Sequence, residues 1–273
     1  MNNFEYLNRV AIGQYIPGSA FIYRLDARTR ILIYFVFIPL VAFLPSIRGV
    51  LACLLAVLLA ITASRIPPGF ALRSLLAPLP FLVFIALVQL FSVPAGDSSI
   101  LFRLGPLTAS IAGVEAGLLL ALRFATLILL VALATFTLST SELVYGLRSL
   151  LRPLSRLGFP SEDFIQIVQI TLRFIPFLAL SAERIAKAQA ARGADWGTKR
   201  GSLLQRARDV VPLIIPLFVT TLRQAENLAL AMDARAYATG ETVTSLRQFQ
   251  FRLADYIAMA AAFFFILGLI YII

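Results

Sequence analysis

Two arginines of this chain stand at the ends of two similar helical segments, each between small residues. The two motifs are Ala191-Arg192-Gly193 and Ala234-Arg235-Ala236. A guanidinium is a planar, permanently charged donor that binds carboxylates and carbonyl oxygens with two hydrogen bonds at once. At the C-terminal end of a helix it also complements the negative end of the helix dipole. Each motif alone therefore fits either ordinary helix capping or a point of attachment for a partner.

The two motifs end a repeat in the sequence. Residues 183–193 align with residues 226–236 without a gap, at a constant offset of 43 residues, and one Glu, three Ala and one Arg coincide. Alanine-rich helices are stable and slim, so a partner can approach them closely. Duplication at a fixed offset favours attachment over capping. Two attachment points indicate two similar sockets, and hence a partner that is a dimer or a pseudo-dimer.

The residue types that most catalytic and metal sites need are missing. The chain has no histidine, which excludes histidine acid–base chemistry, histidine metal ligands and nucleophiles activated by histidine. Its two lysines, Lys187 and Lys199, do not follow a glycine-rich turn, so the phosphate-binding loop of nucleotide hydrolases is absent. We therefore expect no catalytic residue, no cofactor and no metal ion, and a partner must supply any energy.

Two charged residues, Glu115 and Arg123, fall in or near an apolar segment. Charges inside a membrane span usually mark a functional site. The alternatives are a position at the membrane boundary for Glu115 and a position between helices for Arg123. The sequence leaves their roles open.

The elements that carry these residues are mostly membrane spans. Of the 273 residues, 60% are hydrophobic and 14% are charged, whereas soluble domains have about 25% charged residues. A span needs about 20 mostly apolar residues. The sequence therefore predicts an all-α integral membrane protein with about five transmembrane helices, near residues 31–44, 49–63, 75–93, 113–138 and 257–273.

Basic residues predict the orientation of the chain. The net charge of +10 does not indicate nucleic acid, because the arginines adjoin apolar runs and are not interleaved with exposed aromatic residues. Cytoplasmic loops of membrane proteins are rich in Lys and Arg. The arginines around the first three spans lie mainly on one side: Arg9, Arg24, Arg28, Arg30, Arg65 and Arg73. That side, with the N-terminus, is predicted to be cytoplasmic.

This topology divides the chain into three segments. Residues 1–138 hold the N-terminal segment and four spans, and residues 253–273 form the last span. Residues 139–252, between them, hold long amphipathic cytoplasmic helices and both arginine motifs.

Two long helices are expected in the cytoplasmic segment. Ser161 should cap the first, which runs to Arg192, and the second should run from about residue 202 to residue 237. Parts of both are apolar enough to raise the alternative of further spans. Arginines bound these apolar runs at short intervals, so we favour a position at the membrane interface.

The two arginine motifs resemble the pair found in the transmembrane T component of energy-coupling factor transporters. The family often has His and Pro where this chain has Tyr23 and Ala27, and Gly is common at the position of Ala236. The resemblance extends over almost the whole chain and includes Gly13-Gln14-Tyr15-Ile16-Pro17-Gly18, Arg24-Leu25-Asp26-Ala27-Arg28-Thr29-Arg30 and Arg173-Phe174-Ile175-Pro176.

By this resemblance the chain is the coupling subunit of a four-part importer and is not itself an enzyme. Two ATP-binding cassette ATPases would hydrolyse ATP, and a small membrane-embedded S component would capture a vitamin or another micronutrient. Arg192 and Arg235 would each dock in a groove of one ATPase, and the long helices would transmit ATPase movement to the S component. The resemblance implies the plasma membrane of a prokaryotic cell, with membrane lipid around the spans.

Two other classes of protein remain as alternatives. An intramembrane enzyme would turn over its substrate without any partner, although a chain without histidine offers few catalytic arrangements. A stand-alone permease or channel would need polar residues along several spans, and these spans are almost uniformly apolar.

Overall fold

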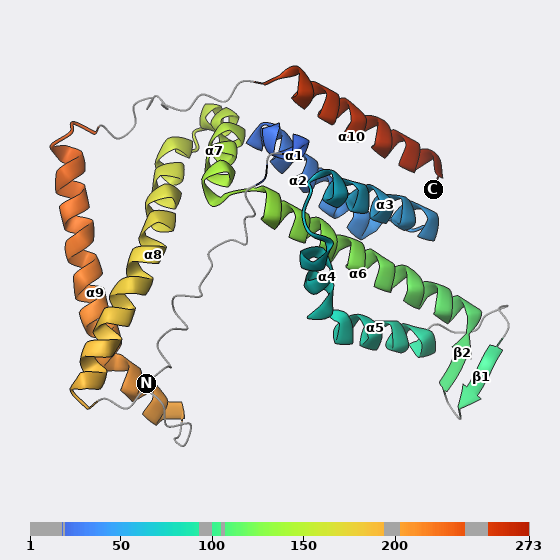
Figure 1. The fold of residues 1–273 in the computed structure, drawn as a ribbon, viewed down its shortest axis with the longest axis horizontal. Coiled ribbons are helices and arrows are strands. Elements are labelled where there is room, and N and C mark those ends of the chain that lie inside the picture. Colours follow the sequence, from blue (N-terminus) through green and yellow to red (C-terminus); the bar gives the residue numbers. More distant parts are fainter. Residues whose placement is uncertain are drawn as a thin grey trace. The chain divides into compact units, whose positions relative to one another are not determined.

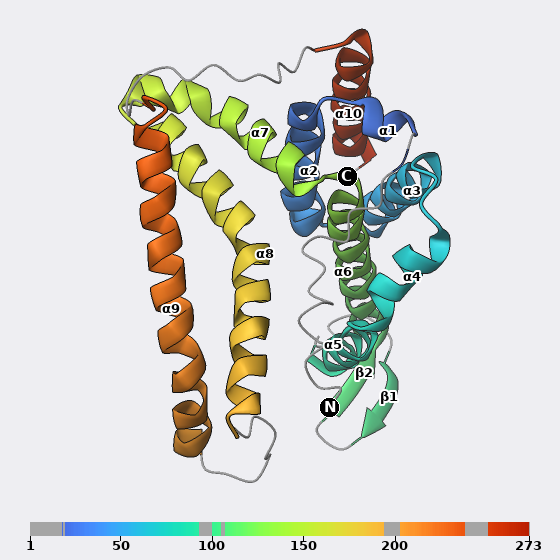
Figure 2. The same ribbon diagram turned by 60° about the vertical axis from the view of Figure 1, so that its left-hand side comes forward.

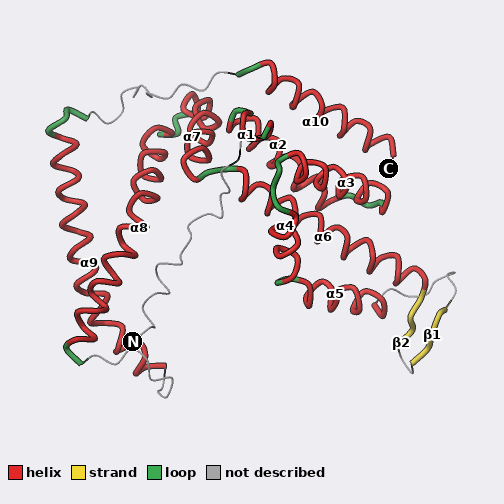
Figure 3. The backbone as a smooth tube through the Cα atoms, viewed as in Figure 1, coloured by secondary structure: helices red, strands yellow, loops and turns green. Residues whose placement is uncertain are grey.

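The computed structural model describes residue 18 and residues 20–92, 100–104, 107–193, 203–237 and 251–272. These residues are largely helical, which confirms the all-α prediction (Figures 1 and 3). Strands β1 (Ile100–Leu104) and β2 (Leu107–Ser110) form a short antiparallel hairpin that was not predicted from the sequence. The helices are α1 (Phe21–Arg24), α2 (Ala27–Phe43), α3 (Ile47–Ala63), α4 (Pro68–Leu76), α5 (Leu79–Ser92), α6 (Ile111–Thr137), α7 (Thr140–Leu151), a 3-10 helix (Arg152–Leu157), α8 (Ser161–Ala191), α9 (Leu203–Asp233) and α10 (Leu253–Ile272).

The described residues fall into two compact units. Those within Gly13–Gly146 and Arg247–Ile273 form one unit, which contains α1 to α6, the first part of α7, and α10. Those within Leu147–Leu246 form the other, which contains α8 and α9. We call these the bundle unit and the helix-pair unit.

Helix α6 is the centre of the bundle unit and packs along α2, α3, α4 and α5. Its first turns approach α5 closely because two glycines lie one turn apart. A Cβ added at Gly113 would lie 2.5 Å from the Leu90 carbonyl oxygen, and one at Gly117 would lie 2.9 Å from that of Ala86. Small residues at this spacing let helix backbones pack closely in membranes.

Large apolar side chains cover the outside of the bundle unit as well as its core. Tyr34, Leu133 and Phe136 belong to one buried cluster. At the same time Phe43 is 85% exposed and Phe264 is 70% exposed. Soluble monomers rarely expose contiguous apolar surface on this scale, whereas lipid is a suitable solvent for it. The exposed faces of these helices therefore contact lipid.

The number of spans differs from the predicted five. By length and composition, three described helices can cross a membrane (α6, α8 and α10), and the bent pair α4–α5 makes a fourth if it counts as one span. Helices α2 and α3 form where spans were predicted, but each has 17 residues, the lower limit of the usual range of about 17–25. The chain bends by 55° between α4 and α5, because Pro78 and Pro80 interrupt the helical hydrogen bonding.

Helix α8 departs from expectation in two respects. Its length and hydropathy are sufficient for a span, although the arginines within it favoured the membrane interface. The helix continues through Arg173, whose side chain is exposed, so this arginine does not end the apolar element. Ser161 is the first helical residue and not its cap, since Pro160 occupies the cap position. The interface position of α8 stays a prediction.

The helix-pair unit confirms the two long helices. Each has 31 residues, which corresponds to a length of about 45 Å at 1.5 Å per residue. The two helices lie side by side and run antiparallel (Figures 1 and 2).

Candidate functional site

The first arginine motif ends helix α8. Arg192 follows the last helical residue and is exposed. Gly193 comes next with φ of +88°, and its N–H donates to the Ala190 carbonyl oxygen at 3.0 Å. Glycine accepts this left-handed conformation without steric cost. The helix therefore stops at the arginine, as the motif predicts.

The second motif reaches the same ending without a glycine. Ala236 has φ of +53°, and its N–H donates to the Asp233 carbonyl oxygen at 2.8 Å. Arg235, just before it, is exposed in the turn that follows α9. The departure from the family at Ala236 thus preserves the helix end. The left-handed conformation costs a residue with a Cβ about 1–2 kcal/mol.

The Ala236→Gly substitution should therefore stabilise the protein by about 1 kcal/mol, because glycine removes that cost. Thermal unfolding in detergent measures the change. Ala234→Gly is the matched control and should destabilise the protein. The Ala234 N–H still donates to the Leu230 carbonyl oxygen as in a helix, where glycine is less favourable than alanine. Equal destabilisation by both substitutions would contradict the assignment.

The two arginines lie at opposite ends of the helix pair, because α8 and α9 run antiparallel (Figure 2). In the part of the chain that the structure describes, neither guanidinium forms an ion pair. The small residues beside them are also exposed: Ala191, Gly193, Ala234 and Ala236. The structure therefore presents the six predicted residues as two separate exposed ends and does not bring them together.

An apolar groove of about 590 Å³ lies between α8 and α9. Its walls offer almost no polar surface. Phe218, Leu222 and Leu180 on this pair are at least half exposed, so apolar surface continues beyond the groove. Exposed apolar surface of this kind is typical of contact with lipid or with an apolar partner. The groove is lined by Ile170, Thr171, Phe174, Ile175, Leu178, Phe218, Thr221, Leu222, Ala225, Leu228, Ala229 and Met232.

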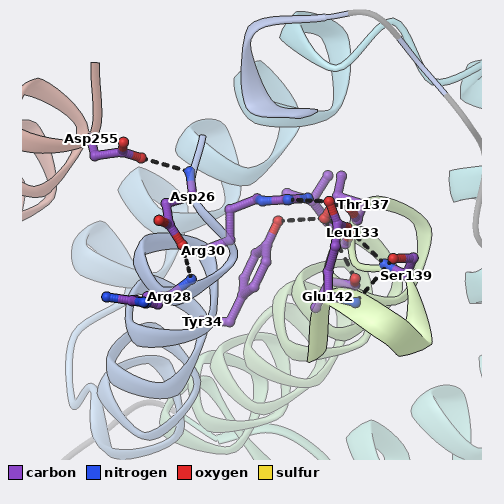
Figure 4. Close-up of polar contacts among 10 residues, drawn as sticks. Asp26, Arg28, Arg30, Tyr34, Leu133, Thr137, Ser139, Glu142 and Asp255 are labelled. Atoms are coloured by element: carbon purple, nitrogen blue, oxygen red, sulfur yellow. Dashed lines mark hydrogen bonds and ion pairs between the residues drawn. The ribbon is translucent and has the colours of Figure 1, made fainter. Parts of the chain in front are cut away.

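A buried polar network in the bundle unit was missed by the sequence analysis (Figure 4). Arg30 is 3% exposed; it donates to the Thr137 carbonyl oxygen and forms an ion pair with the Glu142 carboxylate at 2.9 Å. The hydroxyl of Tyr34, one turn further along α2, lies 2.9 Å from the Thr137 hydroxyl. These contacts join the start of α2 to the end of α6 and the start of α7.

The same end of α2 is tied to α10. The carboxylate of Asp255, 1% exposed, accepts hydrogen bonds from the backbone N–H of Asp26 at 2.7 Å and of Arg252 at 2.8 Å. Asp26 in turn accepts from the Arg28 N–H at 3.0 Å and caps α2. The signal in the sequence is an acidic residue, Asp26, beside two arginines, Arg28 and Arg30, at the start of an apolar segment.

The two charged residues of α6 take different positions. Arg123 donates to the carbonyl oxygen of Leu44 at the end of α2, which is the position between helices that the sequence left open. Glu115 is exposed and lines a pocket together with Arg48, at the turn between α2 and α3.

Comparison with known proteins first defines the class, a membrane component of a transport system. The model of the family described as cobalt transport protein, CbiQ, matches residues 18–246. The energy-coupling factor transporter transmembrane protein EcfT of Heliobacterium modesticaldum is 37% identical over 255 residues, covering 93% of this chain and 94% of that protein. The proteins of the same name from Brevibacillus brevis and Bacillus subtilis are 38% identical over 250 residues (91% of this chain, 92% of theirs) and 32% identical over 266 residues (95% and 99%).

The chain belongs to this family, the transmembrane T components of energy-coupling factor transporters. The resemblance carried by the two arginine motifs is thereby confirmed. The protein is a transmembrane component of a transporter.

Proposed function

We propose that this chain couples ATP hydrolysis by two ATP-binding cassette ATPases to micronutrient uptake by a small S component in the membrane. The observation that carries the proposal is the pair of exposed arginines, Arg192 and Arg235, at the left-handed ends of two antiparallel helices. The names of the relatives, energy-coupling factor transporter transmembrane proteins, support it. Catalysis belongs to the ATPases, and this chain needs no cofactor of its own.

Each arginine docks with one ATPase. The small neighbours, Ala191 and Gly193 in one motif and Ala234 and Ala236 in the other, leave the guanidinium unshielded. A planar fork of donors matches a carboxylate or a pair of carbonyl oxygens in a groove. The helix length of about 45 Å between the two ends supports two separate sockets, one on each ATPase.

The apolar groove between α8 and α9 receives the S component. The groove is open on one side. A small, very hydrophobic membrane protein presents an apolar surface that could cover this open side. Movement of the ATPases would shift the two helix ends, and the groove between the helices would transmit this movement to the S component.

A bulky side chain in the groove should weaken binding of the S component without affecting binding of the ATPases. Ala229→Trp fills the groove, and we expect it to lower recovery of the S component at least about tenfold while both ATPases are retained. Recovery is measured by quantifying subunits that purify with the tagged chain. Thr220→Trp is the control, because Thr220 is exposed on α9 but does not line the groove. Equal loss in both variants would count against the groove.

The helix pair and the N-terminus lie on the cytoplasmic side of a prokaryotic plasma membrane. The excess of arginine before the first span and in residues 139–252 supports this orientation, and ATP is available on that side. The division into residues 1–138, 139–252 and 253–273 rests on the same argument.

Gentle purification of the tagged chain from its native membrane tests the proposal. We expect two cassette ATPases and a small hydrophobic protein to accompany it, and the ligand bound to the small protein would identify the transported substrate. Recovery of the folded chain alone would overturn the proposal. Flux through liposomes that contain only this chain would then establish the permease alternative.

A further inference from the structure

A pocket of about 550 Å³ lies at the turn between α2 and α3, in the bundle unit. This turn joins two successive apolar helices, so it lies at a membrane surface. The opposite wall comes from the first turns of α6. The lining residues are Pro45, Ser46, Ile47, Arg48, Ala112, Glu115, Ala116 and Leu119.

The pocket contains one cation and one anion that form no ion pair with each other. Arg48 and Glu115 both line it and both are exposed. Among the residues that the structure describes, neither forms an ion pair. A ligand that carries both an anionic and a cationic group would satisfy the two side chains together.

Two helix N-termini border the pocket, that of α3 at Arg48 and that of α6 one turn before Glu115. The Ser46 hydroxyl accepts from the Gly49 N–H at 3.1 Å at the start of α3, and the Ser110 hydroxyl accepts from the Gly113 N–H at 3.0 Å at the start of α6. Each serine satisfies one of the four N–H groups that a helix start leaves without a helical partner. The other N–H groups and the positive ends of the two helix dipoles favour a phosphate.

A second, apolar pocket of about 370 Å³ adjoins the first and shares Pro45 with it. It follows the surface of α2 through Val36, Leu40 and Phe43. Phe43 is 85% exposed and Val36 is 43% exposed, so the pocket opens where the helix faces lipid. A charged pocket at the membrane surface that continues into an apolar track along a span has the layout of a phospholipid.

We propose that the two pockets form one binding site for a phospholipid with an amine headgroup, of the phosphatidylethanolamine type. The phosphate accepts hydrogen bonds from Arg48 and the helix N-termini, the ammonium pairs with Glu115, and one acyl chain lies along α2. Charge complementarity selects this occupant, because a phospholipid without an amine leaves Glu115 unpaired beside its headgroup. The apolar track favours a lipid over a soluble zwitterion.

Native mass spectrometry of the purified full-length chain tests the site without any partner, so its outcome is independent of the proposed coupling function. The chain is delipidated and incubated with equal amounts of phosphatidylethanolamine and phosphatidylglycerol in mixed micelles. We expect retention of the amine lipid to exceed that of phosphatidylglycerol about fivefold, the contribution of one partly exposed ion pair. Equal retention of the two lipids by the unmodified chain would overturn the proposal.

Three substitutions give distinct expected patterns. Glu115→Gln should lower the amine lipid about fivefold, to the level of phosphatidylglycerol, and leave phosphatidylglycerol unchanged, whereas Arg48→Gln should lower both lipids about fivefold. Val36→Trp should fill the apolar track and lower both lipids with the ratio unchanged. Arg73→Gln, an exposed arginine on α4 outside both pockets, is the matched control. A Glu115→Gln variant that keeps the ratio of the unmodified chain would also overturn the proposal.

Discussion

Combined substitution of Arg192→Ala and Arg235→Ala should release both ATPases from this chain. A guanidinium docked in a desolvated groove typically contributes about 2 kcal/mol or more to a protein interface. Each single substitution should therefore weaken ATPase binding about 30-fold. The two arginines lie at opposite ends of the antiparallel helix pair, and the effects of distant substitutions add. The double variant should therefore bind the pair of ATPases about 1,000-fold more weakly. Co-purification and ATP-driven uptake in proteoliposomes measure the loss.

The same helices provide a matched control for this experiment. Arg184 on α8 and Arg223 on α9 are exposed arginines away from the helix ends, and their joint replacement by alanine removes the same net charge. We expect this control to keep both ATPases bound. Arg192→Lys keeps the charge but loses the planar fork, so it should resemble alanine more than arginine. Intact assembly of the Arg192→Ala, Arg235→Ala variant would contradict ATPase docking at these residues.

Replacing Arg30 with methionine should destabilise the bundle unit by about 3–5 kcal/mol, the usual cost of removing one partner from a buried ion pair. The Arg30 side chain is 3% exposed, and the Glu142 carboxylate, 21% exposed, would be left without its cation. The Thr137 carbonyl oxygen would lose its guanidinium donor as well. Thermal unfolding of the purified chain in detergent measures the change, and the yield of folded protein should fall with it.

Two further variants show whether the ion pair is responsible. Arg28→Met is the matched control: Arg28 lies on the same helix turn, and its guanidinium stacks on the Phe251 ring at 5.5 Å, a contact worth about 0.5–1 kcal/mol. Arg30→Met combined with Glu142→Leu should recover part of the stability, because removing both partners leaves no uncompensated buried charge. A double variant no more stable than Arg30→Met alone would contradict the assignment to this pair.

Several features of this protein could be predicted from the sequence because they depend on local or additive properties. The apolar composition indicates a membrane protein, however its helices are arranged. The repeat that ends in Arg192 and Arg235 is visible because both copies are contiguous in the chain, and it led to the family that the comparisons show. The ends of α8 and α9 follow from backbone conformation within a few residues of Gly193 and Ala236.

The buried network and the arrangement of the attachment points were decided only by the tertiary structure. Arg30 and Glu142 are 112 residues apart in sequence, and Asp26 and Asp255 are 229 residues apart. The helices they join are apolar on nearly every face, so no polar stripe in the sequence marks which face is buried or which helices are neighbours. Likewise, the antiparallel packing of α8 and α9 alone sets Arg192 and Arg235 at opposite ends. Residue type and spacing determined the kind of contact each arginine can make, while helix packing decided which carbonyl or carboxylate lies within its reach.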